Sequence, residues 1–411
     1  MERIYPKKRG ALRGLLTDSW QTIIDHNEVW MFEAFVFLIL NPFFTMTNTS
    51  IWRYFDVWLA TAVIMLTLFG IMMIRSAITG APAFEDFDIR QGIFALAGIF
   101  VMLGMAAIDY RYFTSAHWFV YFGLIFLLLL VLLLGVANNS AQRWIPFGPI
   151  QLQPSEIGRT FLAVSFGQFL ATRQDQIGDF RNTIVTIVYF AVPISLIFIQ
   201  PDLGMSILYV VMWFMIIVIA GLPLSHFLTL ATAGTIGLIA VLPFLQAYQL
   251  NRVTTFLDPA SDPEQAFNVD QAVISVGSGD WFGKGYMQGT QSQLGFLRVQ
   301  HTDFIFSMIS EEMGFFFGAL IILGLLLFII MRILRIAALS PDPAGRYICI
   351  GIAGSLFFQI FVNVGMNVRL VPVTGLTLPF ISYGGSSLVT LYLAIGVVQS
   401  VLMRHRKQEF G

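Results

Sequence analysis

The chain has 411 residues, of which 57% are hydrophobic and only 11% are charged, and its formal net charge is -1. Soluble domains carry about 25% charged residues, so this composition excludes an ordinary soluble domain and indicates an integral membrane protein. The near-neutral charge predicts no nucleic-acid partner. The single cysteine, Cys349, lies in an apolar run and has no second thiol with which to form an internal disulfide.

Residues 1–55 are predicted to form a cytoplasmic, interfacial N-terminal segment ahead of a membrane domain at 56–411. Its apolar stretch, Trp30–Phe44, is short, contains Glu33 and has Asn-Pro near its end. As an additional span it would force the basic residues before it to the outside, against the positive-inside rule. We therefore expect this stretch to lie along the cytoplasmic membrane surface without crossing it.

Ten later segments are apolar and long enough to be candidate transmembrane helices, each of which needs about 20 residues. They are residues 57–75, 91–108, 116–136, 156–172, 183–199, 203–221, 223–245, 304–331, 345–366 and 385–403. The predicted fold is an all-α polytopic membrane protein with ten transmembrane helices. Ten spans place both termini on one side, and most of the 23 lysines and arginines fall there, which identifies that side as the cytoplasm.

Four polar stretches interrupt the apolar pattern, at residues 143–159, 200–204, 301–304 and 374–387. In the ten-span arrangement each precedes a helix that starts at the outer surface. Helix N-termini carry unpaired N–H groups and a partial positive charge, so several of them together predict a site for a phosphate-bearing ligand. The alternative is ordinary helix capping, since Pro and acidic residues suit a first helical turn.

The longest connection between spans, about 246–303, is predicted to be a large ordered extracytoplasmic loop. Its Gly, Pro and Asp residues indicate turns and short helices. It also contains many apolar and aromatic residues, such as Phe256, Trp281 and Phe282. Disordered segments are poor in such residues, so we expect the loop to fold by burying them.

The stretch "HTDFIFSMISEEMGF" places Asp303 at the start of an apolar helix and Glu311 and Glu312 inside it. A helix beginning at Asp303 would carry Ser307, Ser310 and Glu311 on the same face. A carboxylate in hydrocarbon is costly unless it faces water or a partner. We therefore expect this polar stripe to line the outer mouth of a hydrated cleft, with a purely structural stripe as the alternative.

With these motifs the chain resembles the SEDS family (shape, elongation, division and sporulation). The residues that carry the resemblance include "AQRW", "QPSEIGR", "QPDLG", "RVTTFLDPASDP", "HTDFIFSMISEEMGF" and "LTLPFISYGGSS", in the family's order over residues 57–403. The stretch "GTQSQL" is most similar to the RodA branch. The resemblance covers most of the chain, and the ordered set of motifs is specific.

This resemblance implies a peptidoglycan glycosyltransferase that polymerises lipid II, a disaccharide-pentapeptide on undecaprenyl diphosphate, during cell elongation. The reaction would take place on the outer face of the bacterial cytoplasmic membrane, beside a class B penicillin-binding protein that crosslinks the strands. The family's essential aspartate matches Asp303, which is the predicted general base.

The basic residues Arg143, Arg159 and Lys284 are predicted to hold the diphosphate through charge-assisted hydrogen bonds. Arg159 replaces the lysine usual in the family, which keeps the charge but changes its geometry. Ordinary interface charges are the alternative for Arg143 and Lys284. A further departure is Arg369, in "GMNVRLVP", which the family pattern does not explain.

Four more residues belong to the predicted substrate site: Glu156, Asp202, His301 and Ser386. Glu156 and Asp202 would orient the basic groups or bind a divalent cation, and no cofactor is otherwise indicated. The alternatives are helix capping for both acids, a hydrogen-bonded loop position for His301, and a packing or hinge role for the glycine-rich run that contains Ser386.

Two other functional classes remain open from the residues. Polar groups in broken membrane helices also describe lipid flippases, although the motifs lie at the outer surface and have no counterpart on the inner side. A non-catalytic scaffold that activates a transpeptidase is the third class. Polymer formation from purified lipid II distinguishes the enzyme from both.

Overall fold

The computed structural model describes residues 49–79, 84, 86–138, 141–147, 150–241 and 247–405. Contacts divide the chain into two units, Met1–Arg53 and Tyr54–Gly411. In the first unit only residues 49–53 are described, and they contain the short helix α2 (Thr49–Trp52). The expected interfacial stretch Trp30–Phe44 lies outside the described residues.

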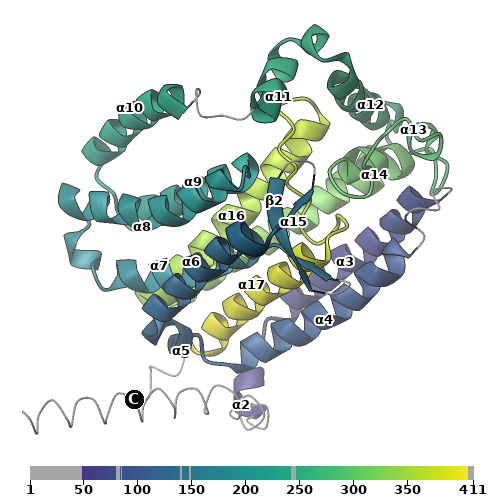
Figure 1. Ribbon diagram of the computed structural model, residues 1–411. Coiled ribbons are helices and arrows are strands. Elements are labelled where there is room, and N and C mark those ends of the chain that lie inside the picture. The colour runs from purple at the N-terminus through teal and green to yellow at the C-terminus, as the bar shows by residue number, and fades with distance from the viewer. Residues whose placement is uncertain are drawn as a thin grey trace, which may run out of the picture. The chain divides into compact units, whose positions relative to one another are not determined.

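The second unit is a helical membrane domain (Figure 1). Its long helices are α3 (Val57–Ile78), α4 (Phe87–Ala107), α6 (His117–Leu134), α7 (Pro154–Ala171), α8 (Phe180–Ile199), α9 (Leu203–Ile219), α10 (Leu224–Val241), α15 (Ile321–Leu339), α16 (Pro343–Asn367) and α17 (Gly385–Met403). The shorter α14 (Ile305–Gly314) and the π-helical segment η5 (Phe315–Leu320) lead into α15. Within the described residues every predicted span coincides with a helix, which confirms the all-α polytopic class.

The number of membrane spans depends on the length of each helix as well as on its apolar character. Seven helical segments of the described chain are long and apolar enough to cross a membrane, and one of them is the continuous run Ile305–Leu339 through α14, η5 and α15. Helix α9 is apolar but has 17 residues. The count of ten spans therefore stays a prediction.

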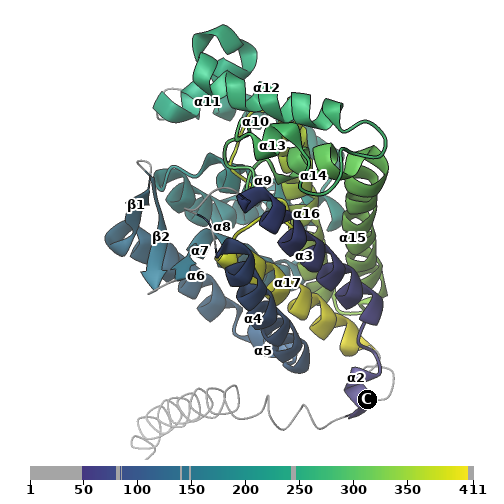
Figure 2. The same cartoon turned by 90° about the vertical axis from the view of Figure 1, so that its right-hand side faces the viewer.

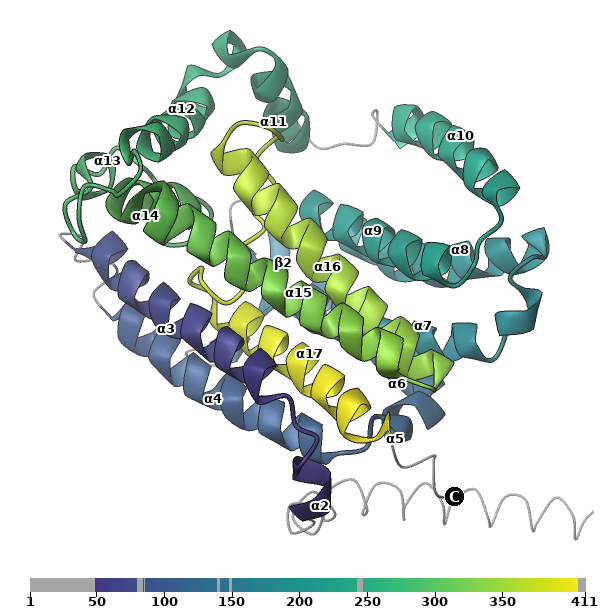
Figure 3. The same cartoon turned by 180° about the vertical axis from the view of Figure 1, so that it is seen from behind.

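Close helix packing in this unit depends on small residues at contact points. Helix α17 packs along α4, and α16 packs against α7, α9 and α15, as the front and rear views show (Figures 1 and 3). A Cβ atom at Gly98 of α4 would lie 2.5 Å from the Tyr392 ring on α17. Gly98 therefore lets α4 approach α17 closely, and a larger residue there would separate the two helices.

A small antiparallel sheet between α6 and α7 was not predicted. Strand β1 (Val136–Asn138) pairs with β2 (Ala141–Phe147), which pairs in turn with β3 (Ile150–Leu152). The pairing brings the polar stretch that starts at Arg143 back to the start of α7 and fixes its direction. Two short helical turns complete this half of the domain, α5 (Tyr110–Ser115) and η2 (Gln174–Gln176).

The long connection after α10 is folded, as expected. Its described part contains α11 (Ala247–Leu257), η4 (Pro259–Ser261), α12 (Pro263–Ser278) and α13 (Thr290–Gln293). Figure 2 shows α11, α12 and α13 together at one end of the domain, which we call the loop end. The starts of α7, α9, α14 and α17 carry the polar motifs that were predicted to lie at the outer surface, on the same side of the membrane as this loop.

The loop crosses the C-terminal end of α14 so closely that only glycine fits at the crossing. A Cβ at Gly283 would lie 2.2 Å from the Glu312 carbonyl oxygen, and a Cβ at Gly314 would lie 2.2 Å from the Gly283 nitrogen. Gly283 and Gly314 both have positive φ, 81° and 75°, which glycine adopts without steric cost. This explains Gly283 in "GSGDWFGKG".

The same crossing supplies the hydrogen bonds that the helix loses where it breaks at Gly314. The loop N–H groups of Lys284 and Gly285 donate to the carbonyls of Glu311 and Glu312, at 3.0 and 2.9 Å. In the other direction, the N–H groups of residues 315 and 316 donate to loop carbonyls at 2.9 and 3.0 Å. An interrupted membrane helix is tolerated when other parts of the protein satisfy its backbone.

Candidate active site

The first residues of α7, α9 and α17 meet at the loop end through Gln153. The Gln153 backbone N–H donates to Ser386 Oγ at 3.1 Å, and its side-chain amide donates to Asp202 Oδ2 at 3.1 Å. Asp202 also caps α9, because its other oxygen accepts a first-turn N–H at 3.2 Å. Three of the predicted helix ends are therefore gathered, and both Ser386 and Asp202 hold them together.

Arg143 reaches this cluster from β2. Its Nε lies 3.8 Å from Asp202 Oδ2, and its guanidinium also donates to the Pro201 carbonyl. The Arg143 side chain is 16% exposed. The structure thus brings Arg143 beside the helix ends, where its charge is available to an anion that approaches them.

Glu156 and Arg159 form an ion pair one turn into α7. The carboxylate and guanidinium are 3.1 Å apart, and Arg159 also donates to Gln359 of α16 at 2.5 Å. Gln359 in turn donates to the Thr377 carbonyl at 2.9 Å. The Arg159 side chain is only 3% exposed, so in this conformation it joins α7 to α16, and its predicted contact with a diphosphate stays a prediction.

Asp303 lies in the turn that precedes α14. Two side chains of α16, Asn363 and Asn367, donate to its carbonyl oxygen at 3.2 and 3.0 Å. Asp303 is half-buried, and desolvation raises the pKa of its carboxyl above the usual 3.8, although the positive charge of Arg252 acts in the opposite direction. A carboxyl with a raised pKa on a turn whose backbone is held in place is suited to accept a proton from a hydroxyl group.

His301 lies two residues earlier in the same turn, among aromatic rings. Its ring centroid is 4.8 Å from that of Phe84, 5.4 Å from Phe87 and 6.0 Å from Tyr383. Its carbonyl accepts the Tyr383 N–H at 2.9 Å, and burial lowers the pKa of the imidazole. The contacts show His301 supporting the turn, and its predicted contact with substrate stays a prediction.

Lys284 does not join the helix-end cluster. Its ammonium bonds to Ser278, Thr290 and Glu311 at 2.9, 2.7 and 2.8 Å. Glu311 is fully buried and also accepts the Gln291 backbone N–H at 3.0 Å. The positive charge of Lys284 is therefore used to hold the loop on α14, which counts against its predicted role as a diphosphate contact.

Glu312 forms the second half of this loop attachment. Its carboxylate accepts hydrogen bonds from Ser76 of α3 at 2.7 Å and from the Met287 backbone N–H at 3.1 Å. Like Glu311, it is fully buried. We call these contacts of Glu311 and Glu312 with the loop and α3 the carboxylate lock.

The expectation of a hydrated polar stripe was wrong below Asp303. The carboxylates of Glu311 and Glu312 are buried and accept hydrogen bonds within the carboxylate lock. Ser307 Oγ donates to Asn367 at 2.6 Å, and Ser310 Oγ donates to a carbonyl of its own helix. The structure instead shows the alternative, a polar stripe that is buried and has a structural role. The acids are tolerated at this depth because partners within the protein satisfy their oxygens.

The expectation that the loop folds by burying its apolar residues was also wrong in part. Trp281 is 60% exposed and Phe282 is 70% exposed, and Leu257, Leu294 and Phe296 are exposed as well. Among the loop residues that the structure describes, only a few apolar ones, such as Ala272 and Leu297, are buried. Buried polar contacts to two carboxylates, more than apolar burial, attach this loop to the membrane domain.

Substitution of Lys284 by methionine should loosen the loop selectively. The change leaves the buried Glu311 carboxylate without its cation, and the local free energy of opening should fall by about 2–3 kcal/mol, a value reduced because Lys284 is partly exposed. Amide hydrogen exchange across residues 283–293 should accelerate about 100-fold. Arg298→Met, which breaks the exposed Arg298–Glu264 pair, is the matched control and should change exchange little. Equal exchange in both variants would contradict the carboxylate lock.

Arg252 is a functional candidate that the sequence analysis did not single out. It lies on α11, donates to the Val373 carbonyl at 3.2 Å, and its charge acts on Asp303. The residue is part of the stretch "NRVTTFLDP", so a signal was present. Asp303 and the Val373 carbonyl both lie far from Arg252 in the sequence, so no local pattern reveals these interactions.

Metal binding has no dedicated ligand set in the part of the chain that the structure describes. No group of three or more His, Cys, Asp or Glu side chains is placed there to hold an ion. Glu156 and Asp202, the acids considered for this role, are instead paired with Arg159 and Arg143.

Known proteins similar to this chain belong to one family. A family model described as the FtsW, RodA and SpoVE cell cycle proteins matches residues 56–407. The peptidoglycan glycosyltransferase MrdB of Escherichia coli K12 is 36% identical over 349 residues, covering 84% of this chain and 93% of the relative. The probable peptidoglycan glycosyltransferase FtsW of Geobacter sp. M18 is 34% identical over 362 residues, covering 86% and 98%.

The fold is also similar to a solved structure. A chain from a study of how a peptidoglycan synthase complex coordinates polymerization and crosslinking superposes with a TM-score of 0.74 at 28% identity, covering 87% of this chain and 99% of that one. The similar identities to FtsW and MrdB do not separate the branches, so the closer likeness to RodA stays a prediction. With the family model matching most of its length, the chain belongs to the FtsW/RodA/SpoVE family, the SEDS family that its motifs predicted.

Proposed function

We propose that this protein is a peptidoglycan glycosyltransferase that polymerises lipid II into glycan strands on the outer face of the cytoplasmic membrane during cell elongation. The names of its relatives support the activity, since MrdB and FtsW proteins at 36% and 34% identity are called peptidoglycan glycosyltransferases. The structural observation that carries the proposal is Asp303, a half-buried residue in a turn that Asn363 and Asn367 hold through its backbone carbonyl and that Ser382 bonds from the segment leading into α17.

In this proposal the loop end faces outward and Asp303 is the general base. A hydroxyl of the acceptor sugar attacks the anomeric carbon of the donor and transfers its proton to the Asp303 carboxylate. As the new C–O bond forms, the bond from the anomeric carbon to the diphosphate oxygen breaks, and undecaprenyl diphosphate leaves with the electron pair.

The leaving diphosphate requires positive charge close to the helix ends. Arg143 supplies it in this proposal, because its partly exposed guanidinium lies beside the N-termini of α7 and α9. Asp202 orients Arg143 and caps α9 at the same time. Both lipid tails stay in the bilayer, which requires that the site open sideways between helices.

We further propose a class B penicillin-binding protein as the partner and cytoplasmic positions for both termini. The partner is supported by the similar chain found in a complex that coordinates polymerization and crosslinking. The cytoplasmic positions of the termini follow from the distribution of basic residues along the sequence.

Labelling of an introduced cysteine tests this topology. In a chain lacking Cys349, a cysteine introduced at Ser19 should be shielded from impermeant thiol reagents outside intact cells. Labelling there would contradict this topology.

Polymerisation of purified lipid II in detergent tests the proposed activity. The chain, with a cognate transpeptidase present and then absent, should produce glycan polymer that is degraded by a muramidase. A flippase would move lipid II across vesicle membranes without forming polymer, and a scaffold would do neither. Absence of polymer in both conditions from the folded protein would therefore contradict the proposal.

A further inference from the structure

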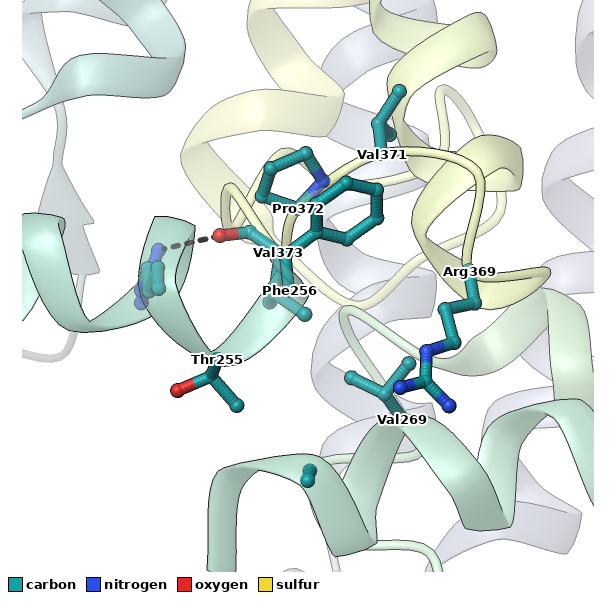
Figure 4. Close-up of a pocket in the computed structure, with 9 residues that line it drawn as sticks. Thr255, Phe256, Val269, Arg369, Val371, Pro372 and Val373 are labelled. Atoms are coloured by element: carbon teal, nitrogen blue, oxygen red, sulfur yellow. Dashed lines mark hydrogen bonds between the residues drawn. The ribbon is translucent and has the colours of Figure 1, made fainter. Parts of the chain in front are cut away.

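A pocket at the loop end lies between α11, α12 and the segment that follows α16 (Figure 4). Two of the residues that line it are arginines, Arg252 and Arg369, and apart from Thr255 the others are apolar. The apolar walls include Phe256, Val269 and Pro372. None of the described lining residues is acidic, so the pocket combines positive charge with apolar surface.

Arg369 occupies a backbone position that favours glycine. Its φ is 57°, in the left-handed region, where a residue with a Cβ is about 1 kcal/mol or more less stable than glycine. Its guanidinium donates to Asp270 of α12 at 2.7 Å, and both side chains remain partly exposed. An exposed ion pair contributes little stability, so the pair alone does not explain an arginine at this position.

The pocket is connected to the turn that carries Asp303. Arg252 donates to Val373 in the pocket wall at 3.2 Å, and its charge also acts on the Asp303 carboxyl. Three residues further along the wall segment, the Leu376 carbonyl accepts from Asn363 at 2.8 Å, and Asn363 also bonds the Asp303 carbonyl. A sugar bound at Asp303 could therefore extend a substituent into the pocket.

We propose that this pocket binds the free carboxylate at the end of the peptide carried by the substrate, with Arg369 as its main contact. The proposal rests on the glycosyltransferase function proposed above. The diphosphate is held at membrane depth by its lipid, whereas the peptide projects from the sugar and can reach α11 and α12. The peptide would place its terminal carboxylate against the two guanidiniums and the small aliphatic groups beside it against the apolar walls of the pocket. Arg369 is then a specificity-determining residue that exchanges Asp270 for the substrate carboxylate.

Two lipid II substrates that differ in one group provide the test. One carries a pentapeptide with a free C-terminal carboxylate, and the other carries the same pentapeptide as a C-terminal carboxamide, which removes the charge at nearly constant size. Purified full-length protein with its transpeptidase partner should polymerise both, and the carboxamide should show a KM about threefold to tenfold higher.

Two variants should shift the KM for the acid substrate in opposite directions. Arg369→Gln removes the guanidinium and should raise this KM to the carboxamide value. Asp270→Asn removes the competing carboxylate and should lower the KM for the acid about twofold to threefold, with the carboxamide unaffected. Arg298→Gln, at the other exposed ion pair of the loop, is the control and should leave both values unchanged.

The outcomes separate this proposal from its alternatives. If the Arg369–Asp270 ion pair only stabilises the fold, both variants should raise the KM of both substrates, and this result would overturn the proposal. Equal KM values for the acid and the carboxamide in the unmodified protein would also overturn it. If Arg369→Gln raises the KM of both substrates equally, the pocket binds another anion such as the diphosphate. Absence of polymer from either substrate would contradict the proposed function instead.

Discussion

Replacing Asp303 by asparagine should lower the rate of lipid II polymerisation by about a hundredfold or more. General-base catalysis contributes roughly that much, and asparagine has nearly the same shape but cannot accept the proton. The turn should remain in place, because Asn363 and Asn367 bond to the backbone carbonyl of residue 303 and not to its side chain. Rates from purified protein, together with an unfolding temperature close to that of the unmodified chain, measure both effects.

The matched control is Asp280→Asn, the same change at an exposed acid of the same loop. It should leave polymerisation nearly unchanged. An Asp303→Asn protein that folds normally and retains activity close to that of the control would show that Asp303 is not the base.

The pH dependence of the unmodified enzyme follows from the same carboxyl. Desolvation raises the pKa of Asp303 above 3.8, and only its deprotonated form can accept a proton. Polymerisation should therefore fall as pH is lowered through this raised pKa, and Asp303→Asn should abolish this acid limb along with most of the activity.

A second large effect, on both stability and polymerisation, is expected from substitution of Arg159. Arg159→Ala leaves the buried Glu156 carboxylate without its cation and should reduce the free energy of unfolding by about 3–5 kcal/mol, together with loss of polymerisation. Arg159→Lys keeps the charge and should retain most of the stability and activity. Thermal unfolding of the purified variants and the polymerisation assay measure the two effects separately.

A double variant distinguishes a structural role of Arg159 from a role in substrate binding. In Glu156→Gln combined with Arg159→Met, neither buried charge remains, so most of the stability should return. We expect polymerisation to stay low, because the positive charge proposed to assist the diphosphate is gone. Recovery of activity along with stability would show that Arg159 acts only by compensating Glu156, and its predicted diphosphate contact would be wrong.

Several features of this protein follow directly from local sequence. Long apolar runs predicted the positions of the long helices, because a helix in lipid must satisfy its own backbone and present apolar side chains. The largest difference is the run Ile305–Leu339, which was predicted to end at residue 331. The helix starts were also predictable, since Asp202 and the Pro after Gln153 have local capping roles. The ordered motifs identified the family.

The partners of the buried charged groups were not predictable. The sequence shows that Glu311 and Glu312 need partners at their depth, but water, a cation and a backbone N–H all satisfy that need. Their partners include Lys284, 27 residues away, and Ser76, 236 residues away. The mistaken hydrated stripe and the mistaken apolar burial of the loop have this common cause: the loop is attached by polar contacts that only the folded chain brings together.

The sequence by itself therefore determined the class of protein, the positions of its helices and the acid proposed for catalysis. Each of these depends on the properties of residues close together in the chain. Only the tertiary structure decided which partner each charged group has. All three basic groups are paired with buried carboxylates, but Arg143 lies beside the helix ends, whereas Lys284 holds the loop on α14 and Arg159 joins α7 to α16. The difference arises from long-range packing, because the energy of a charge depends on burial and on its partner.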